Sequence, residues 1–310
     1  MRFSTRFFSA IALSAVMLGA AFADPLRGVI APEALQARLG EKNLVVIDLR
    51  SDEKKEQAIA QFKASHIPGA VHADYAHASW RVPRDGISVY LPSPAQFEAL
   101  VGNLGVSPES DVVIVHEGQD ATSFGAAARV YWSFKAMGHA SIAILDGGWR
   151  DWISEKSRPL ASGASAPSPA IYEAKPIPSL RASLEEVLAA EKNNVALVDG
   201  RPESYYSGAE KHKAVKAFGH IPGAVSIPHS RALDANLRLK DRATLEKDFA
   251  AATGRAAIAY CNTGHWGATD WFVLSEILGR SETKLYDGSM LEYSLENKGP
   301  VSTTKPVSGS

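Results

Sequence analysis

Short apolar runs alternate with longer amphipathic stretches along most of the chain. The clearest runs are residues 45–47, 112–115, 196–198 and 256–260. These runs are three to five residues long, and the stretches between them are long enough for a helix. Short buried strands that alternate with helices are typical of an α/β domain whose sheet is mainly parallel. The pattern therefore predicts an α/β fold.

The same order of motifs occurs twice. Residues 65–71 read Ser-His-Ile-Pro-Gly-Ala-Val, and residues 219–225 read Gly-His-Ile-Pro-Gly-Ala-Val. An apolar run ending in Asp-x-Arg precedes each copy, at Asp48 with Arg50 and at Asp199 with Arg201. Another apolar run, a helix-like stretch ending in glycine, and an Asp-Gly pair follow each copy. Five features in one order predict an internal duplication.

The chain begins with the pattern of an export signal. Arg2 and Arg6 precede an apolar run at 7–19, and Ala-Phe-Ala follows at 21–23. A basic start, a short apolar core and an A-x-A exit are typical of a cleaved secretory signal peptide, and the apolar core is too short to span a bilayer. We expect export to a bacterial periplasm, with no membrane anchor.

Composition indicates where the chain after the signal peptide divides into domains, and its net charge argues against one class of partner. Residues 157–179 are rich in proline, serine and alanine without periodicity, which indicates an extended linker. We expect a signal peptide at 1–23, a first domain at 24–160, a linker at 161–180 and a second domain at 181–310. Loss of two arginines with the signal changes the formal net charge from −1 to −3. That balance argues against nucleic acid as a partner.

Cys261 is the one cysteine in the chain, so it forms no internal disulfide. It ends an apolar run, and a helix pattern begins near Gly267. Ligands bind beyond the carboxyl ends of strands in such sheets, where loops enter helices. Gly264 is free to take positive φ in a tight loop. Backbone N–H groups of this loop and the helix N-terminus would point at the sulfur and favour the thiolate. The sequence therefore predicts a nucleophilic thiol.

These duplicated motifs together resemble tandem-domain rhodaneses, the sulfurtransferases, over about residues 28–295. The resemblance implies two tandem rhodanese-like domains, each a mainly parallel sheet flanked by helices, with the catalytic cysteine only in the second. It implies that Cys261 takes a sulfane sulfur from a small donor anion, holds it as a persulfide and passes it to a thiophilic acceptor. The implied loop residues around the persulfide are Asn262, Thr263, Gly264, His265 and Trp266. Asp199 and Arg201 would form a supporting pair.

The first copy lacks the thiol. Residues 115–120 read Val-His-Glu-Gly-Gln-Asp at the matching turn, so an acid is expected in place of the nucleophile. Glu117 and Asp120 are both candidates for that position. By the resemblance, the first domain is inactive and closes one wall of the active site.

The second copy departs from the resemblance where donor-binding cations are expected. Asn262 and Thr263 follow the cysteine where thiosulfate-type members often carry basic residues, and Gly-Ser-Gly of the mercaptopyruvate type is absent. Tyr205 stands where an arginine is expected. Two groups are candidates to replace the missing donor-binding cations, and each has a purely structural alternative. His265 either binds a donor and protonates a leaving group, or simply faces solvent. The lysines at 211–216 either lean over the site or form a solvated loop.

Other thiol and ligand chemistries fit poorly. Cysteine phosphatases need C-x5-R, and the sixth residue after the cysteine is Gly267. No metal-ligand spacing and no phosphate-binding GxxxxGK[ST] motif occurs. No cofactor is implied, because the chemistry needs only a thiolate and oriented dipoles. The alternative to a thiosulfate or 3-mercaptopyruvate sulfurtransferase is a non-enzymatic periplasmic sulfane-sulfur carrier, or a redox-sensing protein, loaded by a sulfur-relay partner.

Overall fold

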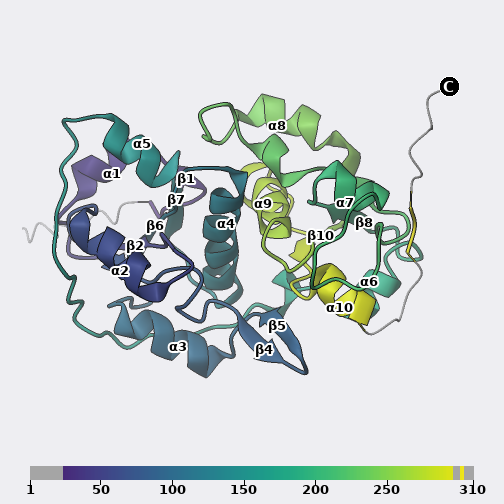
Figure 1. Ribbon diagram of the computed structural model, residues 1–310, viewed down its shortest axis with the longest axis horizontal. Helices are drawn as coiled ribbons and strands as arrows, with labels where there is room; N and C mark the ends of the chain where they lie inside the picture. The colour runs from purple at the N-terminus through teal and green to yellow at the C-terminus, as the bar shows by residue number, and fades with distance from the viewer. Residues whose placement is uncertain (1–23, 296–300, 304–310) are drawn as a thin grey trace, which may run out of the picture.

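The computed structural model describes residues 24–295 and 301–303, which form two α/β domains lying side by side (Figure 1). The predicted signal peptide at 1–23 lies outside the described residues. Among the described residues, no helix combines the length and the apolar character that crossing a membrane requires.

The first domain is built on a five-stranded parallel sheet in the order β1-β7-β6-β2-β3. In chain order its strands are β1 (Val29–Ile30), β2 (Leu44–Asp48), β3 (Val71–His72), β6 (Asp111–Val115) and β7 (Ile142–Leu145). Its helices are α1 (Pro32–Arg38), α2 (Lys55–Ala64), α3 (Pro94–Asn103), α4 (Ala121–Ala136) and α5 (Gly148–Ser154). An antiparallel hairpin, β4 (Val82–Arg84) and β5 (Ile87–Tyr90), reaches toward the second domain (Figure 1).

The second domain repeats this design with a four-stranded parallel sheet in the order β11-β10-β8-β9. Its strands are β8 (Ala196–Asp199), β9 (Val225–Ser226), β10 (Ala257–Tyr260) and β11 (Thr283–Leu285). Its helices are α6 (Leu184–Leu188), α7 (Glu203–Ser207), α8 (Arg242–Asp248), α9 (Gly267–Phe272) and α10 (Ser289–Leu295). The remaining helical segments are short 3₁₀ turns at Pro178–Leu180, His229–Ala232 and Ala250–Ala252, and a π-helical turn at Val273–Ile277. The predicted α/β fold is confirmed in both copies.

Local sequence explains where key elements begin. The Ser183 hydroxyl accepts from the Glu186 amide and completes a capping box that starts α6. At α4, the Asp120 carboxylate accepts from the Ser123 amide at 2.7 Å. The helix predicted from Gly267 begins there, but it passes into the π-helical turn before it ends.

The two domains share one apolar core, which is formed where α4 packs against α9 (Figure 1). The Phe272 ring lies 5.7 Å from the Phe124 ring and 4.9 Å from the Tyr131 ring, edge to face in both cases. The Tyr131 hydroxyl also donates to Glu276 at 2.7 Å. Because α4 and α9 each follow the central strand of their sheet, this packing brings the carboxyl ends of β6 and β10 together.

The segment between the domains, residues 155–177, contains no helix or extended strand. It runs back along the first domain through backbone pairs. Ala161 pairs with His66, the Ala170 amide donates to Gly102 at 2.9 Å, and the Lys175 amide donates to Met137 at 2.9 Å.

The shared core predicts that the domains unfold together. Phe272→Ala removes a fully buried ring of the second domain that packs against α4 of the first. The substitution should destabilise the protein by ~3–5 kcal/mol. Phe218→Ala is the matched control, because Phe218 is 49% exposed and its loss should change stability by less than ~0.5 kcal/mol. Urea denaturation followed by fluorescence measures both. Two separate transitions in the wild-type protein would contradict a shared core.

Candidate active site

Cys261 follows β10 directly and opens the loop that leads into α9. Its side chain is 1% exposed. Its backbone is held at both polar groups, because the amide donates to the Ser289 hydroxyl at 3.1 Å and the carbonyl accepts from Met290 at 3.0 Å. The thiol therefore sits at a fixed point where strand, loop and helix meet.

Ser289 organises this loop. Its Oγ accepts a second amide, from Gly264 at 3.0 Å, and donates to the Tyr286 carbonyl at 2.8 Å. Ser289 has a φ of 51°, a left-handed conformation unusual for a side-chain-bearing residue. In the first domain Gly148 occupies the same turn with a φ of 64°. The strained backbone aims one hydroxyl at both ends of the turn that carries the thiol.

The loop leaves several backbone donors unused. Within the described residues no hydrogen-bond acceptor is found for the amides of Asn262, Thr263, His265, Trp266 and Gly267. Gly264 has the expected positive φ of 67°, but its own amide is taken by Ser289 and does not join this group. Asn262 is 3% exposed and neither polar atom of its side chain has a partner, whereas Thr263 is half-buried.

Arg129, a residue of α4 in the first domain, reaches across to the same loop. Its Nη1 donates to the Gly264 carbonyl at 3.1 Å, and its Nη2 donates to Val89 at 2.9 Å. The guanidinium is fully buried and lies 3.7 Å from the Asp287 carboxylate. A Cβ on Gly264 would meet both Arg129 and Asp287. Our sequence analysis missed Arg129, although a charge in the middle of the mostly apolar 124–134 stretch was a usable signal.

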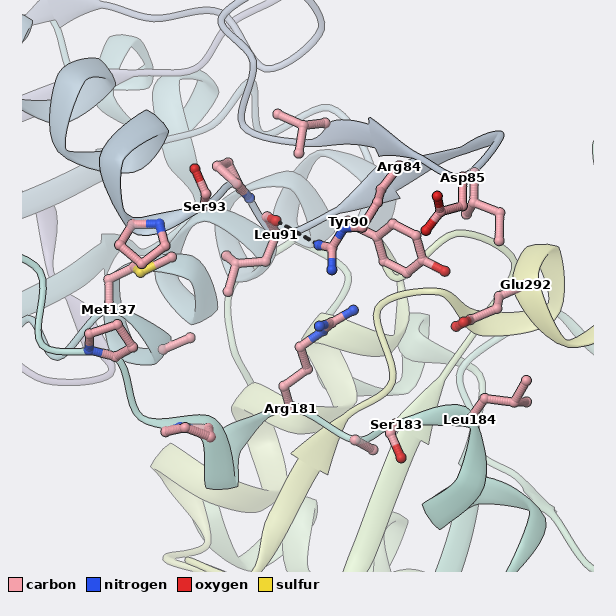
Figure 2. A pocket seen from close by; sticks show the side chains of 18 of the residues that line it. Arg84, Asp85, Tyr90, Leu91, Ser93, Met137, Arg181, Ser183, Leu184 and Glu292 are labelled. Atoms are coloured by element: carbon pink, nitrogen blue, oxygen red, sulfur yellow. Dashed lines mark hydrogen bonds between the residues drawn. The ribbon is translucent and has the colours of Figure 1, made fainter.

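Asp287 links this arrangement to a cavity of about 820 Å³ between the domains. One carboxylate oxygen accepts from Arg181 Nε at 2.8 Å, and the other accepts from the Leu91 amide at 2.8 Å. Figure 2 shows Arg84 and Arg181 directed toward Tyr90, with guanidinium carbons 4.6 and 5.2 Å from the ring centre. Cys261 does not line this cavity.

The first turn of α4 also holds the two loop residues that precede α9. The His265 ring donates from Nε2 to the Thr122 carbonyl at 2.7 Å, and the Trp266 indole donates to the Thr122 hydroxyl at 3.2 Å. Gly125 permits this approach, because a Cβ there would collide with the His265 ring. Burial, with smaller contributions that include nearby Arg81, lowers the pKa of His265 to about 3. His265 is therefore neutral at pH 7, which argues against the alternative in which it protonates a leaving group.

Tyr205 contacts the loop through Trp266. The Tyr205 and Trp266 rings lie 6.2 Å apart and nearly parallel, and the His229 ring stacks on Trp266 at 4.8 Å. His229 donates from Nδ1 to the Gly200 carbonyl at 2.9 Å. Trp266 is thus packed between aromatic rings.

Asp199 and Arg201 form a buried pair beneath the site. The Arg201 Nη2 donates to Asp199 at 2.6 Å and to the Gly219 carbonyl at 2.8 Å, which ties β8 to the His-Ile-Pro-Gly motif. The Tyr260 hydroxyl donates to the same carboxylate at 2.8 Å. Asp48, Arg50 and Ser65 repeat the arrangement in the first domain. The pair supports the loop from below without touching the thiol.

Sheet register identifies the first-domain equivalent of the thiol. Tyr260 pairs with Asp199, and Val115 pairs with Asp48, so His116 stands where Cys261 stands. The His116 carbonyl accepts from Trp149 at 2.8 Å, just as that of Cys261 accepts from Met290. The expectation of an acid at this position was wrong. Glu117 matches Asn262, and Asp120 caps α4.

The lysine-rich segment at 211–216 turns to other partners. Lys211 donates to the Val215 carbonyl at 3.0 Å, and the Lys216 amide donates to Ser294 of α10 at 2.9 Å. No hydrogen bond, ion pair or ring contact joins this segment to residues 261–266 in the described structure. A search of the same described residues finds no group of three His, Cys, Asp or Glu side chains suited to a metal ion.

Asp270, in α9, is a buried acid that our sequence analysis did not single out. It is 0% exposed, and neither carboxylate oxygen has a partner in the described structure. Burial, assisted by the negative charge of Asp199, raises the pKa of Asp270 well above its usual value. A Cβ on Gly200 would collide with this carboxyl group, so that glycine makes room for it.

The role of Ser289 predicts faster hydrogen exchange in its absence. Ser289→Ala keeps a Cβ but removes the acceptor for two amides, which should cost ~2 kcal/mol of stability. Exchange measured by mass spectrometry should accelerate in peptides that contain Cys261 and Gly264. Ser294→Ala is the matched control, because it removes one hydroxyl in the same helix and should affect the Lys216 region instead. Unchanged exchange at 261–264 in Ser289→Ala would contradict the role.

The buried acid predicts a specific pH dependence. The folded protein retains the Asp270 proton at pH values where the unfolded chain has lost it, so this residue lowers stability as pH rises above ~4, until the raised pKa is passed. Asp270→Asn lacks this component. The free energy of unfolding of the variant minus that of the wild type should therefore grow by up to ~1.4 kcal/mol per pH unit above pH 4. Parallel stability curves from denaturant titrations between pH 4 and 8 would rule out a buried protonated acid.

Comparison with known proteins agrees with this architecture. The chain matches the family model described as "Rhodanese-like domain" twice, at residues 31–155 and 183–296. It is 34% identical to a putative thiosulfate sulfurtransferase of Mycobacterium tuberculosis over 249 residues, which cover 77% of this chain and 86% of the relative. It is 33% identical to the thiosulfate sulfurtransferase of Rattus norvegicus over 246 residues, which cover 76% of this chain and 80% of the relative.

Solved structures share the fold. SseA from Escherichia coli, described as a 3-mercaptopyruvate sulfotransferase, matches with a TM-score of 0.70 and 24% identity over 84% of this chain and 98% of its own. The Tum1 protein of Saccharomyces cerevisiae matches with a TM-score of 0.74 and 22% identity over 91% of this chain and 100% of its own. With two matched domains and relatives above 30% identity, the chain belongs to the rhodanese family and is a sulfurtransferase.

Proposed function

We propose that the protein moves a sulfane sulfur from a small anionic donor, of the thiosulfate or 3-mercaptopyruvate kind, to a thiophilic acceptor through a persulfide on Cys261. The observation that carries the proposal is the loop itself. A buried thiol stands at the start of a turn in which five backbone amides lack an acceptor. Such donors have the chemistry to stabilise a negative terminal sulfur, as an oxyanion hole stabilises oxygen.

The transfer balances without a cofactor. With thiosulfate, the Cys261 thiolate attacks the outer sulfur of the donor, a new S–S bond forms, and sulfite leaves with the electron pair of the broken S–S bond. The persulfide carries the negative charge on its terminal sulfur. Attack of cyanide on that sulfur then releases thiocyanate and returns the thiolate. No proton is needed in either step, which agrees with a neutral His265.

Burial of the thiol favours a small donor over a protein partner. At 1% exposure, the Cys261 thiol offers a second protein almost no surface to contact, whereas a donor of a few atoms needs a much smaller opening to reach it. The non-enzymatic carrier needs direct docking of a partner onto the thiol. The enzymatic reading is therefore the one that we retain.

We extend the proposal to location. Residues 2–23 carry the basic start, apolar core and Ala-Phe-Ala exit of a cleaved export signal, so we place the mature protein in the periplasm. One cysteine and no possible internal disulfide leave the thiol available for chemistry there.

Intact mass tests the covalent intermediate. The mature protein incubated with thiosulfate, and separately with 3-mercaptopyruvate, should gain one sulfur atom that cyanide removes as thiocyanate over many turnovers. Cys261→Ser should gain none. Absence of sulfur on a thiol that iodoacetamide still alkylates would contradict the proposal.

A further inference from the structure

We propose that the first domain supplies the anion-binding group of the active site, with Arg81 binding the charged end of the donor and the Tyr75 hydroxyl donating to it. This inference rests on the proposed function and specifies which chemical class of donor the site accepts. It assigns substrate recognition to one copy and the nucleophile to the other.

Tyr75 and Arg81 lie next to each other, beside the loop that follows Cys261. Both lie on the segment after the first His-Ile-Pro-Gly-Ala-Val motif, which Trp80 fastens by donating from Nε1 to the Ala73 carbonyl at 2.9 Å. The Tyr75 ring meets the His265 ring of the catalytic loop edge to face at 5.0 Å. The Arg81 guanidinium carbon lies 4.8 Å from the centre of the Tyr75 ring. Arg81 thus stacks on the side chain that touches the catalytic loop.

The Arg81 guanidinium and the Tyr75 hydroxyl both lack a hydrogen-bond partner within the described structure. Arg81 is half-buried, and within the described structure its guanidinium has no hydrogen bond and no ion pair. Tyr75 is only 9% exposed, and its hydroxyl is buried without a partner. A buried hydroxyl and a partly desolvated cation both cost free energy when they lack a partner. Their occurrence together beside the catalytic loop indicates a site for an anion that is absent from the protein itself.

Side chains of the first domain also lie against the loop that carries the thiol. The Tyr75 ring contacts His265, four residues after Cys261, and Arg129 binds Gly264, three residues after it, so both first-domain side chains approach the loop that carries the thiol. Burial raises the pKa of Tyr75, which keeps the hydroxyl protonated as a donor. Arg129 already binds Gly264 in the loop, Val89 in the hairpin and the Asp287 carboxylate. Arg81 is the cation of this group that remains available to a substrate.

The second copy has no cation of its own in the loop after Cys261. Residues 262–266 carry no lysine or arginine. Tyr205 is directed to Trp266, and the lysine-rich segment at 211–216 makes no contact with the loop in the described structure. A donor such as thiosulfate carries its charge on oxygens at the end opposite the sulfur under attack. A guanidinium matches such oxygens by paired N–H donation.

A first experiment measures anion recognition without requiring turnover. Iodoacetate and iodoacetamide alkylate the same thiol and differ in the negative charge of the first. In the full-length mature protein, Arg81→Ala should lower the ratio of the iodoacetate rate to the iodoacetamide rate on the order of 10-fold, the size of one lost charged hydrogen bond. Tyr75→Phe should lower the ratio by a smaller factor. Arg81→Lys should restore part of it.

Arg84→Ala is the matched control. Arg84 also stacks on a tyrosine, Tyr90 of the same hairpin, but it lines the cavity between the domains, which Cys261 does not line (Figure 2). Its loss should leave the alkylation ratio unchanged. A thermal melt of each variant separates loss of the site from loss of the fold, because the iodoacetamide rate and the melting temperature should stay at their wild-type values in Arg81→Ala.

A second experiment connects the site to sulfur transfer. Arg81→Ala should raise the KM for thiosulfate on the order of 10-fold, because the donor anion loses its cation, whereas Arg84→Ala should leave this KM unchanged. An equal alkylation ratio in wild type and Arg81→Ala would overturn the inference, even if the enzyme turns over. Absence of persulfide in wild type, together with a lowered ratio in Arg81→Ala, would instead reject the proposed function and keep the anion site.

Discussion

The contact on which the rest of the site depends is the reach of Arg129 across the domain junction. This one buried guanidinium binds the catalytic loop at Gly264, the hairpin at Val89 and the carboxylate of Asp287. Burying a charge is costly unless hydrogen bonds and an opposite charge compensate for it, and here the compensation comes from both domains. The second domain therefore carries the thiol, but its loop acquires a defined shape only against the first.

Ser289 completes the constraint from the other side. A hydroxyl held in a left-handed turn accepts two loop amides, and for the amides of the other loop residues no acceptor is found in the described part of the chain. Secondary structure would normally use such donors. Their lack of an acceptor beside a buried thiol is the physical basis for our proposal of persulfide chemistry at this loop.

Local patterns were sufficient for much of this architecture. The duplication, the strands and the loop around Cys261 all follow from motifs that are contiguous in the chain. What lay beyond the sequence was the pairing of distant elements. Arg129 and Tyr75 belong to the first copy, and only the packing of the first domain against the second brings them to the loop after Cys261. The match of His116 with Cys261 likewise needed sheet register, because the two loops differ in length and residue type.

The turn that holds Ser289 also bears on how the two copies diverged. In the first domain Gly148 adopts nearly the same backbone without a hydroxyl, and His116 fills the position of the thiol. A cysteine placed at His116 would therefore lack the hydroxyl that Ser289 supplies behind Cys261, and adding that hydroxyl would require a side chain where a Cβ would collide with the His116 carbonyl. A thiol alone would thus not reproduce in the first domain the loop that surrounds Cys261 in the second.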